Sequence, residues 1–412
     1  MKSKGQIIKF LRWTEKYTKT DMVYVAKGGF WLIFGRISTM LLSLATMFAF
    51  ARWVSKETFG KYQYIIATIN IVAIFLLPAM GAALIRAVAK GKDGMLALCA
   101  KAKIKWGLIS VIITLFVSLW YFSHGNTSLG ISFLIASIMF PLPRVFNLYA
   151  PFWKGKKKFD TQAKYQVSIN ILEALVFIPV LFLTNNLIII LIAYFLSRAI
   201  FRGIFFVISL RRRENKETDK ETIPFGKHLT LMSAFATFAD KIDKIIIWQF
   251  LGPMSVAIYS FAQIPVQRSQ GLAPFSALAL PKLSQKGFAE TKKGLFKKFL
   301  KFFLFSIPLF LAFIALAPIG YKLLFPNYME AVPYARVLAI SIMFIPFSLL
   351  STALTAGMKT RELYKIKFIA PAIKVLLFLI LIPLYGIWGI IFSILLTQIF
   401  GNLLTLYLFK KA

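Results

Sequence analysis

Long apolar stretches alternate with short polar gaps along almost the entire chain. A helix needs about 20 apolar residues to cross the hydrocarbon core of a bilayer. Twelve stretches come close to that length and predict an all-α integral membrane protein with 12 transmembrane helices. The expected spans are Gly29–Phe50, Tyr64–Ile85, Trp106–Phe122, Leu129–Trp153, Val167–Thr184, Leu187–Leu210, Leu229–Leu251, Met254–Leu280, Phe299–Phe325, Ala331–Met358, Phe368–Leu384 and Ile387–Phe409.

Basic residues are concentrated in every second polar gap. The gaps Ser123–Ser128, Asn185–Asn186 and Gly252–Pro253 contain no Lys or Arg, whereas the gaps of the opposite parity are rich in both. Lys and Arg are retained on the cytoplasmic side during membrane insertion. The alternation therefore predicts that both termini are cytoplasmic and that the number of spans is even.

Composition narrows the class of protein further. The chain is 58% hydrophobic and carries a formal net charge of +35. A soluble domain with so much apolar surface would precipitate, and a nucleic-acid-binding protein of this charge would not contain twenty-residue apolar runs. A single cysteine, Cys99, excludes a disulfide within the chain. His124 and His228 are far apart in the sequence, so we expect no metal site and no cofactor.

The polar stretch 211–228 divides the expected spans into six plus six. The apolar runs before Gly29 are too short and too interrupted for a cleavable signal peptide. The predicted parts are a cytoplasmic, basic and partly amphipathic N-terminal segment (1–28), an N-lobe (29–210), a cytoplasmic linker (211–228), a C-lobe (229–409) and a cytoplasmic C-terminal tail (410–412).

Several basic residues fall deep within the expected spans. A charge at the bilayer centre costs roughly 3 kcal/mol on insertion scales, so such residues should face a wet cavity or a partner. We interpret the deepest of them as one cationic, substrate-binding lumen, with scattered contacts between helices as the alternative. They are Arg36, Arg144, Lys244, Arg268 and Lys374.

Acidic residues are rarer at this depth. Glu173 lies at a depth similar to Arg202, with Arg198 one helical turn away, which is typical of a structural ion pair. Asp240 and Asp243 would share one helix face with Lys244 if this span is a continuous helix. Such carboxylates either couple transport to a proton or sodium gradient or form a structural ion pair, and the sequence favours neither.

The loops exclude several functions. All expected outer loops are short, which leaves no room for the large outer domain of a membrane-embedded glycosyltransferase or polymerase. No loop contains a phosphate-binding motif of the GxxxxGK[ST] type. Nothing resembles a nucleophile triad, so we expect no catalytic residue and a function carried out inside the helix bundle.

Short motifs then identify a family. In order they are Gly29…Phe34-Gly35, Ala51-Arg52…Glu57…Phe59-Gly60…Tyr62, Gly81…Leu84-Ile85-Arg86, Asp243-Lys244-Ile245-Ile246-Ile247…Gly252…Tyr259, Pro281-Lys282-Leu283-Ser284, Phe325…Tyr328…Ala331 and Tyr385-Gly386-Ile387-Trp388-Gly389. Their order and spacing resemble the polysaccharide-transporter family, which contains the Wzx-type O-antigen flippases. This family belongs to the multidrug/oligosaccharidyl-lipid/polysaccharide (MOP) exporter superfamily.

The resemblance implies two six-helix lobes that work by alternating access, driven by an ion gradient. It implies a flippase of the bacterial inner membrane that moves an undecaprenyl-diphosphate-linked oligosaccharide of O-antigen or a similar surface polysaccharide to the outer leaflet. The implied partners are membrane lipid, H⁺ or Na⁺ for antiport, a polysaccharide polymerase and chain-length proteins, and no nucleic acid.

Two alternatives remain at this stage: a cation-coupled drug or metabolite exporter and, less favoured because the outer loops are short, a membrane-embedded glycosyltransferase or polymerase. A cation-coupled drug or metabolite exporter would have the same fold, but its lumen would depend on carboxylates rather than cations. Flippases of the peptidoglycan precursor typically have fourteen spans, which argues against that substrate.

Overall fold

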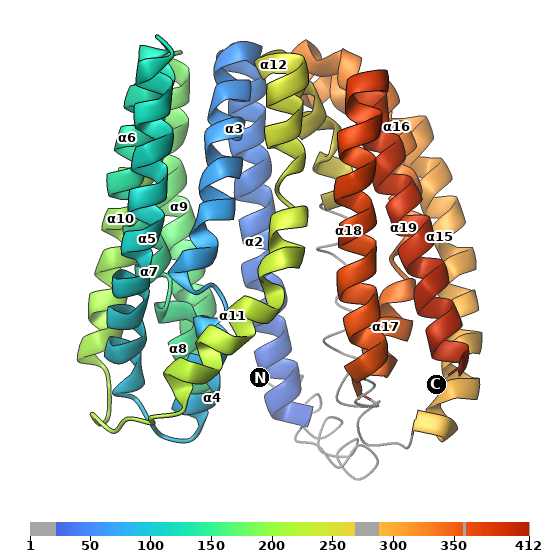
Figure 1. Ribbon diagram of the computed structural model, residues 1–412. Helices are drawn as coiled ribbons and strands as arrows, with labels where there is room; N and C mark the ends of the chain where they lie inside the picture. The colour runs from blue at the N-terminus through green and yellow to red at the C-terminus, as the bar shows by residue number, and fades with distance from the viewer. Residues whose placement is uncertain (1–21, 268–287, 357–359, 412) are drawn as a thin grey trace, which may run out of the picture. The chain divides into compact units, whose positions relative to one another are not determined.

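The computed structural model describes residues 22–267, 288–356 and 360–411, which form helices and loops with no β-strand (Figure 1). The predicted all-α membrane fold is confirmed. Ten helical stretches within these ranges are long and apolar enough to cross a membrane, or eleven if one bent pair counts as a span. The start of the expected amphipathic segment (1–21) and Arg268 lie outside the described residues.

The difference from twelve expected spans arises mainly where two of them are joined. The stretch Thr222–Ala262 counts as one span of 41 residues. At 1.5 Å per residue, its length is about twice the thickness of a hydrocarbon core. Gly252 interrupts it with a left-handed φ of 77° directly before Pro253. The sequence divides the two expected spans at the same dipeptide.

The chain forms two compact units. The first comprises Met1–Met47, Val72–Thr184 and Ile188–Leu231, and the second comprises Phe48–Ile71, Asn185–Leu187 and Met232–Ala412. Helix α2 (Met22–Trp53) contributes to both units. The expected lobes 29–210 and 229–409 stay a prediction.

The first unit is built around α5. This long helix packs against α6 in a hairpin, as the teal ribbons show (Figure 1). The hairpin turn is closed by Asn126, whose side chain accepts a hydrogen bond from the Leu129 N–H at 3.1 Å. The helices of this unit are η1 (Ala73–Leu76), α4 (Met80–Ala89), α5 (Met95–Ser123), α6 (Thr127–Met139), α7 (Pro141–Phe146), α8 (Tyr149–Gly155), α9 (Phe159–Leu183) and α10 (Leu187–Arg211).

The linker after α10 is tied to two loops of the same unit. Lys156 Nζ lies 2.7 Å from Asp93 Oδ2 and 2.9 Å from Glu214 Oε2. The Glu214 N–H donates to the same Asp93 oxygen at 2.9 Å. Asp93 is fully buried, so this linker contact, made by Asp93, Lys156 and Glu214, is a specific attachment.

The second unit contains α3, the C-terminal part of α11 and the remaining helices. A tight hairpin joins α18 to α19 through Gly386, which has a φ of 58°. A Cβ atom at Gly389 would lie 1.9 Å from the Leu381 carbonyl oxygen, so the two helices meet closely there. The helices are α3 (Lys56–Val72), α11 (Thr222–Ala239), α12 (Asp243–Ala262), α15 (Phe288–Leu324), η2 (Pro326–Ala331), α16 (Val332–Leu338), η3 (Ala339–Phe344), α17 (Phe347–Ala356), α18 (Thr360–Tyr385) and α19 (Ile387–Lys411).

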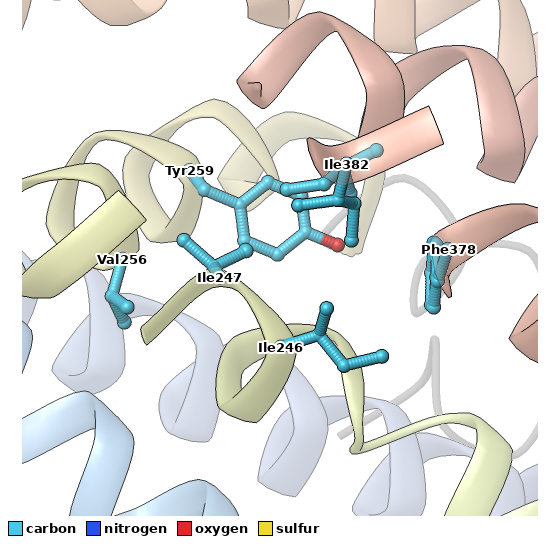
Figure 2. Close-up of a cluster of buried hydrophobic side chains, with 7 residues drawn as sticks. Ile246, Ile247, Val256, Tyr259, Phe378 and Ile382 are labelled. Carbon is cyan, nitrogen blue, oxygen red and sulfur yellow. The ribbon is translucent and has the colours of Figure 1, made fainter. Parts of the chain in front are cut away.

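A hydrophobic cluster anchors α12 to this hairpin. Ile247, Tyr259 and Phe378 are each fully buried in it (Figure 2). Ile382 and Ile390, on either side of the hairpin turn, complete the contact. The cluster fixes the helix that carries Asp243 against the helix that carries Lys374.

Several expected spans are divided into shorter helices at proline. The expected span Leu129–Trp153 is three helices, because α6 ends before Pro141 and α7 ends at Phe146. The expected span Tyr64–Ile85 is interrupted next to Pro78, where Leu77 has a left-handed φ of 51°. Proline removes a backbone donor and clashes with the preceding turn, which explains both breaks.

Candidate functional site

Two arginines of the first unit pair with one carboxylate, and two further cations continue the group from there. Arg202 donates from Nε to Glu173 Oε1 at 2.8 Å, and Arg198 Nε lies 3.4 Å from the other oxygen. The Glu173 side chain is only 12% exposed. Arg144 lies within electrostatic range of both arginines and of Lys103. We call Lys103, Arg144, Glu173, Arg198 and Arg202 the basic cluster.

The basic cluster is assembled from four helices. Lys103 comes from α5, Arg144 from α7, Glu173 from α9, and the two remaining arginines from α10. The break before Pro141 gives α7 its separate start, and Arg144 follows within its first turn. Because four positive charges meet one negative charge, the cluster keeps a local excess of about three positive charges. It is therefore suited to an anion.

The sequence analysis missed Lys103. It assigned this residue to an inner loop, but α5 begins at Met95, and Lys103 is only 7% exposed. A signal was present in the pattern. Small and polar residues recur every three or four positions along α5, and Lys103 is in phase with them. The buried positions on this face are Cys99, Lys103, Gly107, Ser110, Thr114 and Ser118.

A ladder of polar side chains runs from this cluster toward α2. Tyr149 lies within electrostatic range of Arg202 and Glu173. Its hydroxyl donates to Gln166 Oε1 at 3.0 Å, and the Gln166 amide donates to Asn170 Oδ1 at 2.9 Å. The ladder ends where the Asn170 amide donates to Oγ1 of Thr39, on α2, at 2.7 Å.

Arg36 is one helical turn before Thr39 on α2. It is exposed within the first unit and lies within electrostatic range of Lys154. A Cβ atom at neighbouring Gly35 would lie 3.6 Å from the Ala163 side chain on α9, an ordinary packing distance. Arg36 therefore adds positive charge on the helix that the polar ladder reaches.

The expected shared face of Asp240, Asp243 and Lys244 is wrong. Helix α11 ends at Ala239 and α12 begins at Asp243, so a turn separates the two aspartates. The expectation assumed a continuous helix through this span. Asp240 is 68% exposed, whereas Asp243 is 6% exposed.

The two aspartates have different partners, all within the second unit. Asp240 Oδ1 accepts from Lys374 Nζ at 3.0 Å. Asp243 Oδ2 accepts from the Tyr259 hydroxyl at 2.6 Å and from the Gln263 amide at 3.3 Å. Tyr259 is a partner that the sequence analysis did not assign. Asp243 is thus a buried carboxylate held by neutral donors.

The other cations of the expected lumen have partners elsewhere in the structure or lie outside the described residues. The ammonium group of Lys244 donates to Gln63 Oε1 at 2.7 Å, and Lys374 pairs with Asp240 as above. Arg268 is not among the described residues. The structure thus brings Arg144 together with Arg198 and Arg202. The single lumen made of Arg36, Arg144, Lys244, Arg268 and Lys374 stays a prediction.

The chain is similar in fold to several solved membrane transporters. The lipid II flippase MurJ in an inward closed conformation aligns with a TM-score of 0.68 at 14% identity, covering 93% of this chain and 87% of MurJ. An outward-facing multidrug resistance MATE transporter of the MOP superfamily aligns with a TM-score of 0.66 at 13% identity, covering 92% and 96%. A MOP superfamily transporter from Pyrococcus furiosus, described as having a binding pocket of reverse polarity, reaches 0.60 at 14% identity, covering 92% and 95%.

These similarities establish the MOP fold, as the sequence motifs predict. Among curated proteins, none matches the chain. A family described as polysaccharide biosynthesis protein matches residues 25–287, which is more than half of the sequence. The chain belongs to this polysaccharide biosynthesis protein family.

Proposed function

We propose that the protein is a flippase for an oligosaccharide repeat unit linked to undecaprenyl diphosphate. It moves this lipid from the cytoplasmic to the outer leaflet of the bacterial inner membrane by alternating access. The observation that carries the proposal is the basic cluster, which holds a net positive charge within the membrane-spanning helices of the first unit. The match to a polysaccharide biosynthesis family supports a substrate on the route to O-antigen or a similar surface polysaccharide.

The chemistry of the cluster fits a diphosphate. Charges inside a membrane are costly and are retained where they act on a substrate or ion. Arginine presents a planar set of donors that can bind phosphate oxygens in pairs, with bonds about twice as strong as neutral ones. Glu173 holds Arg198 and Arg202 in place, and Arg144 is the cation that we assign to the diphosphate.

Transport is coupled to an ion gradient in this proposal, with H⁺ or Na⁺ moving in antiport. Asp243 is the coupling residue, because it is buried and bonded to neutral donors. Asp240 has a structural role with Lys374. The polysaccharide polymerase and chain-length proteins receive the flipped lipid as partners.

The test uses the purified protein in vesicles that contain a fluorescent undecaprenyl-diphosphate oligosaccharide. Arg144→Gln should lower the flipping rate at least tenfold, the factor that about 1.4 kcal/mol represents. Arg144→Lys should retain part of the rate, because the charge remains but the paired donors are lost. Arg211→Gln, at the exposed end of α10, is the matched control. Wild-type rates in Arg144→Gln would contradict the assignment.

A second candidate is a cation-coupled multidrug exporter, favoured by the equally good fit to the MATE fold. The basic cluster would repel the cationic compounds that such an exporter carries. Competition separates the two functions. A cationic dye should not displace the lipid-linked diphosphate from the wild-type protein, whereas displacement would favour the exporter.

A further inference from the structure

A pocket of about 550 Å³ lies within the second unit, between η3, α17, α18 and α19. Its volume falls within the range of about 300–1,000 Å³ that is usual for small-ligand sites. Helix α19 presents one continuous face to it, with positions spaced three or four residues apart. These positions are Ile394, Thr397, Gln398, Gly401, Asn402 and Thr405.

Three polar atoms in the pocket lining are buried without a hydrogen-bond partner among the residues that the structure describes. They are Oγ of Ser341, Oγ1 of Thr397 and Oε1 of Gln398. Ser341 is 2% exposed and Thr397 is 8% exposed. Buried polar atoms are normally bonded, so these three atoms around one pocket can each take a further hydrogen bond.

The helix itself could have satisfied these hydroxyl groups. A Ser or Thr in a helix commonly donates to the carbonyl oxygen four residues earlier. On α19, Ser393 donates to Gly389 and Thr405 donates to Gly401, each at 2.7 Å. Thr397 lies one turn after Ser393 and has no such bond. Its hydroxyl group is therefore left for a ligand in the pocket.

The lining specifies the chemistry of that ligand. Hydroxyl groups both donate and accept, and the Gln398 oxygen accepts only, so the ligand must carry O–H or N–H donors. Asp240 is the acidic residue of the lining, and it is already bonded to Lys374 at 3.0 Å. A cation therefore finds no uncommitted carboxylate, and the charge of the lining is balanced. Phe344 and Phe347 form an apolar part of the pocket wall.

We infer that this pocket binds the saccharide of the lipid-linked substrate through Ser341, Thr397 and Gln398. The inference rests on the proposed function and adds to it a sugar subsite in the second unit. Sugars combine hydroxyl groups with apolar C–H faces, as the lining requires. The polar ladder of the first unit is less suited to a sugar than this pocket, because Tyr149, Gln166 and Asn170 already bond to one another.

The experiment measures binding to the full chain in lipid nanodiscs by microscale thermophoresis. The three probes are undecaprenyl-diphosphate-linked oligosaccharide extracted from the cells in which the protein is native, undecaprenyl diphosphate without sugar, and the oligosaccharide released from that extract. Wild-type protein should bind the linked oligosaccharide more tightly than the bare diphosphate. Thr397→Val and Gln398→Leu should each weaken that binding about threefold, and together about tenfold, while affinity for the bare diphosphate stays unchanged.

Two further variants serve as controls. Ser393→Ala removes a buried hydroxyl group on the same helix that is already bonded, and Thr397→Ser keeps the hydroxyl group. Both should bind the linked oligosaccharide as the wild type does. A Thr397→Ser variant as weak as Thr397→Val would show that packing rather than hydrogen bonding is lost, and would overturn the inference.

The remaining outcomes separate the subsite from the proposed function. If the double variant loses equal affinity for the linked oligosaccharide and for undecaprenyl diphosphate without sugar, the sugar subsite is overturned and the proposed function is not. Free oligosaccharide that binds as tightly as the linked form would make this a site for soluble sugar, and would also overturn it. Wild-type protein that binds neither diphosphate would contradict the proposed function and, with it, the subsite.

Discussion

Glu173 is the single acidic side chain in the basic cluster, so its charge affects several cations at once. Its two oxygens contact Arg202 and Arg198, Arg144 lies within electrostatic range of these arginines, and Lys103 lies within electrostatic range of Arg144. Removing one partner of a buried ion pair leaves an uncompensated charge, which costs more than the pair itself is worth.

We therefore expect Glu173→Gln to destabilise the protein by about 3 kcal/mol. The double variant Glu173→Gln with Arg202→Gln should be less destabilised than the sum of the two single variants, since the second change removes a charge left unpaired. Chemical denaturation in detergent measures both. Glu57→Gln is the control, because the Glu57–Lys61 pair is exposed and should contribute less than about 1 kcal/mol. Additive effects at Glu173 and Arg202 would contradict the expected coupling.

Residue-level features were only partly predictable from the sequence. Depth within the spans placed Glu173 at the level of Arg202, and the two side chains form an ion pair. The shared face of Asp240 and Asp243 was wrong, because it assumed one continuous helix, whereas α11 ends at Ala239 and α12 begins at Asp243. The partnership of Asp243 with Tyr259 joins residues sixteen positions apart across the Gly252 turn, which periodicity cannot reveal.

At the scale of elements, one close contact between helices gives a physical reason for a family motif. A Cβ atom at Gly60 on α3 would lie 1.9 Å from the Pro253 carbonyl oxygen on α12. Neighbouring Phe59 is fully buried against Phe261 and Tyr328. The Phe59-Gly60 pair therefore holds α3 against α12 within the second unit.

Gly60→Ala should destabilise the protein by about 2 kcal/mol, because the obstructing atom is backbone and cannot rotate away. The melting temperature of the purified protein measures this effect. Gly294→Ala is the matched control on α15, where an added Cβ meets nothing within 4 Å. There, alanine should be neutral or should stabilise the helix by up to about 1 kcal/mol. A Gly60→Ala protein as stable as Gly294→Ala would show that α3 and α12 can separate without cost.

The linker contact of the first unit depends on three side chains from three different connections. Burial would lower the pKa of Lys156, but its bonds to Asp93 and Glu214 outweigh burial and raise it. The hydrogen bond from Lys156 lowers the pKa of Glu214. The contact therefore stabilises the folded state fully only while Lys156 is protonated and Glu214 is ionised.

Lys156→Met should consequently destabilise the protein, with a pH dependence of defined sign. The stability difference from wild type should be full between the ordinary pKa of Glu, 4.5, and that of Lys, 10.5. It should shrink as the pH falls through the lowered pKa of Glu214, and again as the pH rises through the raised pKa of Lys156. Urea denaturation over a pH series measures the difference. Lys92→Met is the control, since its pair with Glu217 is more exposed. A difference that does not change with pH would contradict the contact.

For the whole molecule, the alternation of apolar stretches and basic gaps was sufficient to predict the fold class. Expected boundaries failed mainly where spans are assembled from short helices, as in the three helices between Thr127 and Gly155. Such breaks keep the hydropathy of a span while changing its direction, so hydropathy alone cannot place them. The breaks matter for the proposed function, because Arg144 follows one break and Asp243 follows another.

The proposed ion coupling belongs to the whole molecule, and Asp243 is the residue that allows us to test it. A coupling carboxylate must lose or gain its ion during the transport cycle. Among the residues that the structure describes, Asp243 accepts hydrogen bonds from donors that remain when its charge is removed: the Tyr259 hydroxyl, the Gln263 amide and the Lys244 N–H. Asp243→Asn preserves the shape of the side chain and should leave binding of the lipid-linked diphosphate measurable. In reconstituted vesicles it should abolish the response of flipping to imposed pH and sodium gradients, applied one at a time. Asp240→Asn should keep that response, since Asp240 is exposed and paired with Lys374. If flipping by Asp243→Asn still responds to the gradients, Asp243 has only a structural role, in which it links the start of α12 to Tyr259 in the second half of the same helix.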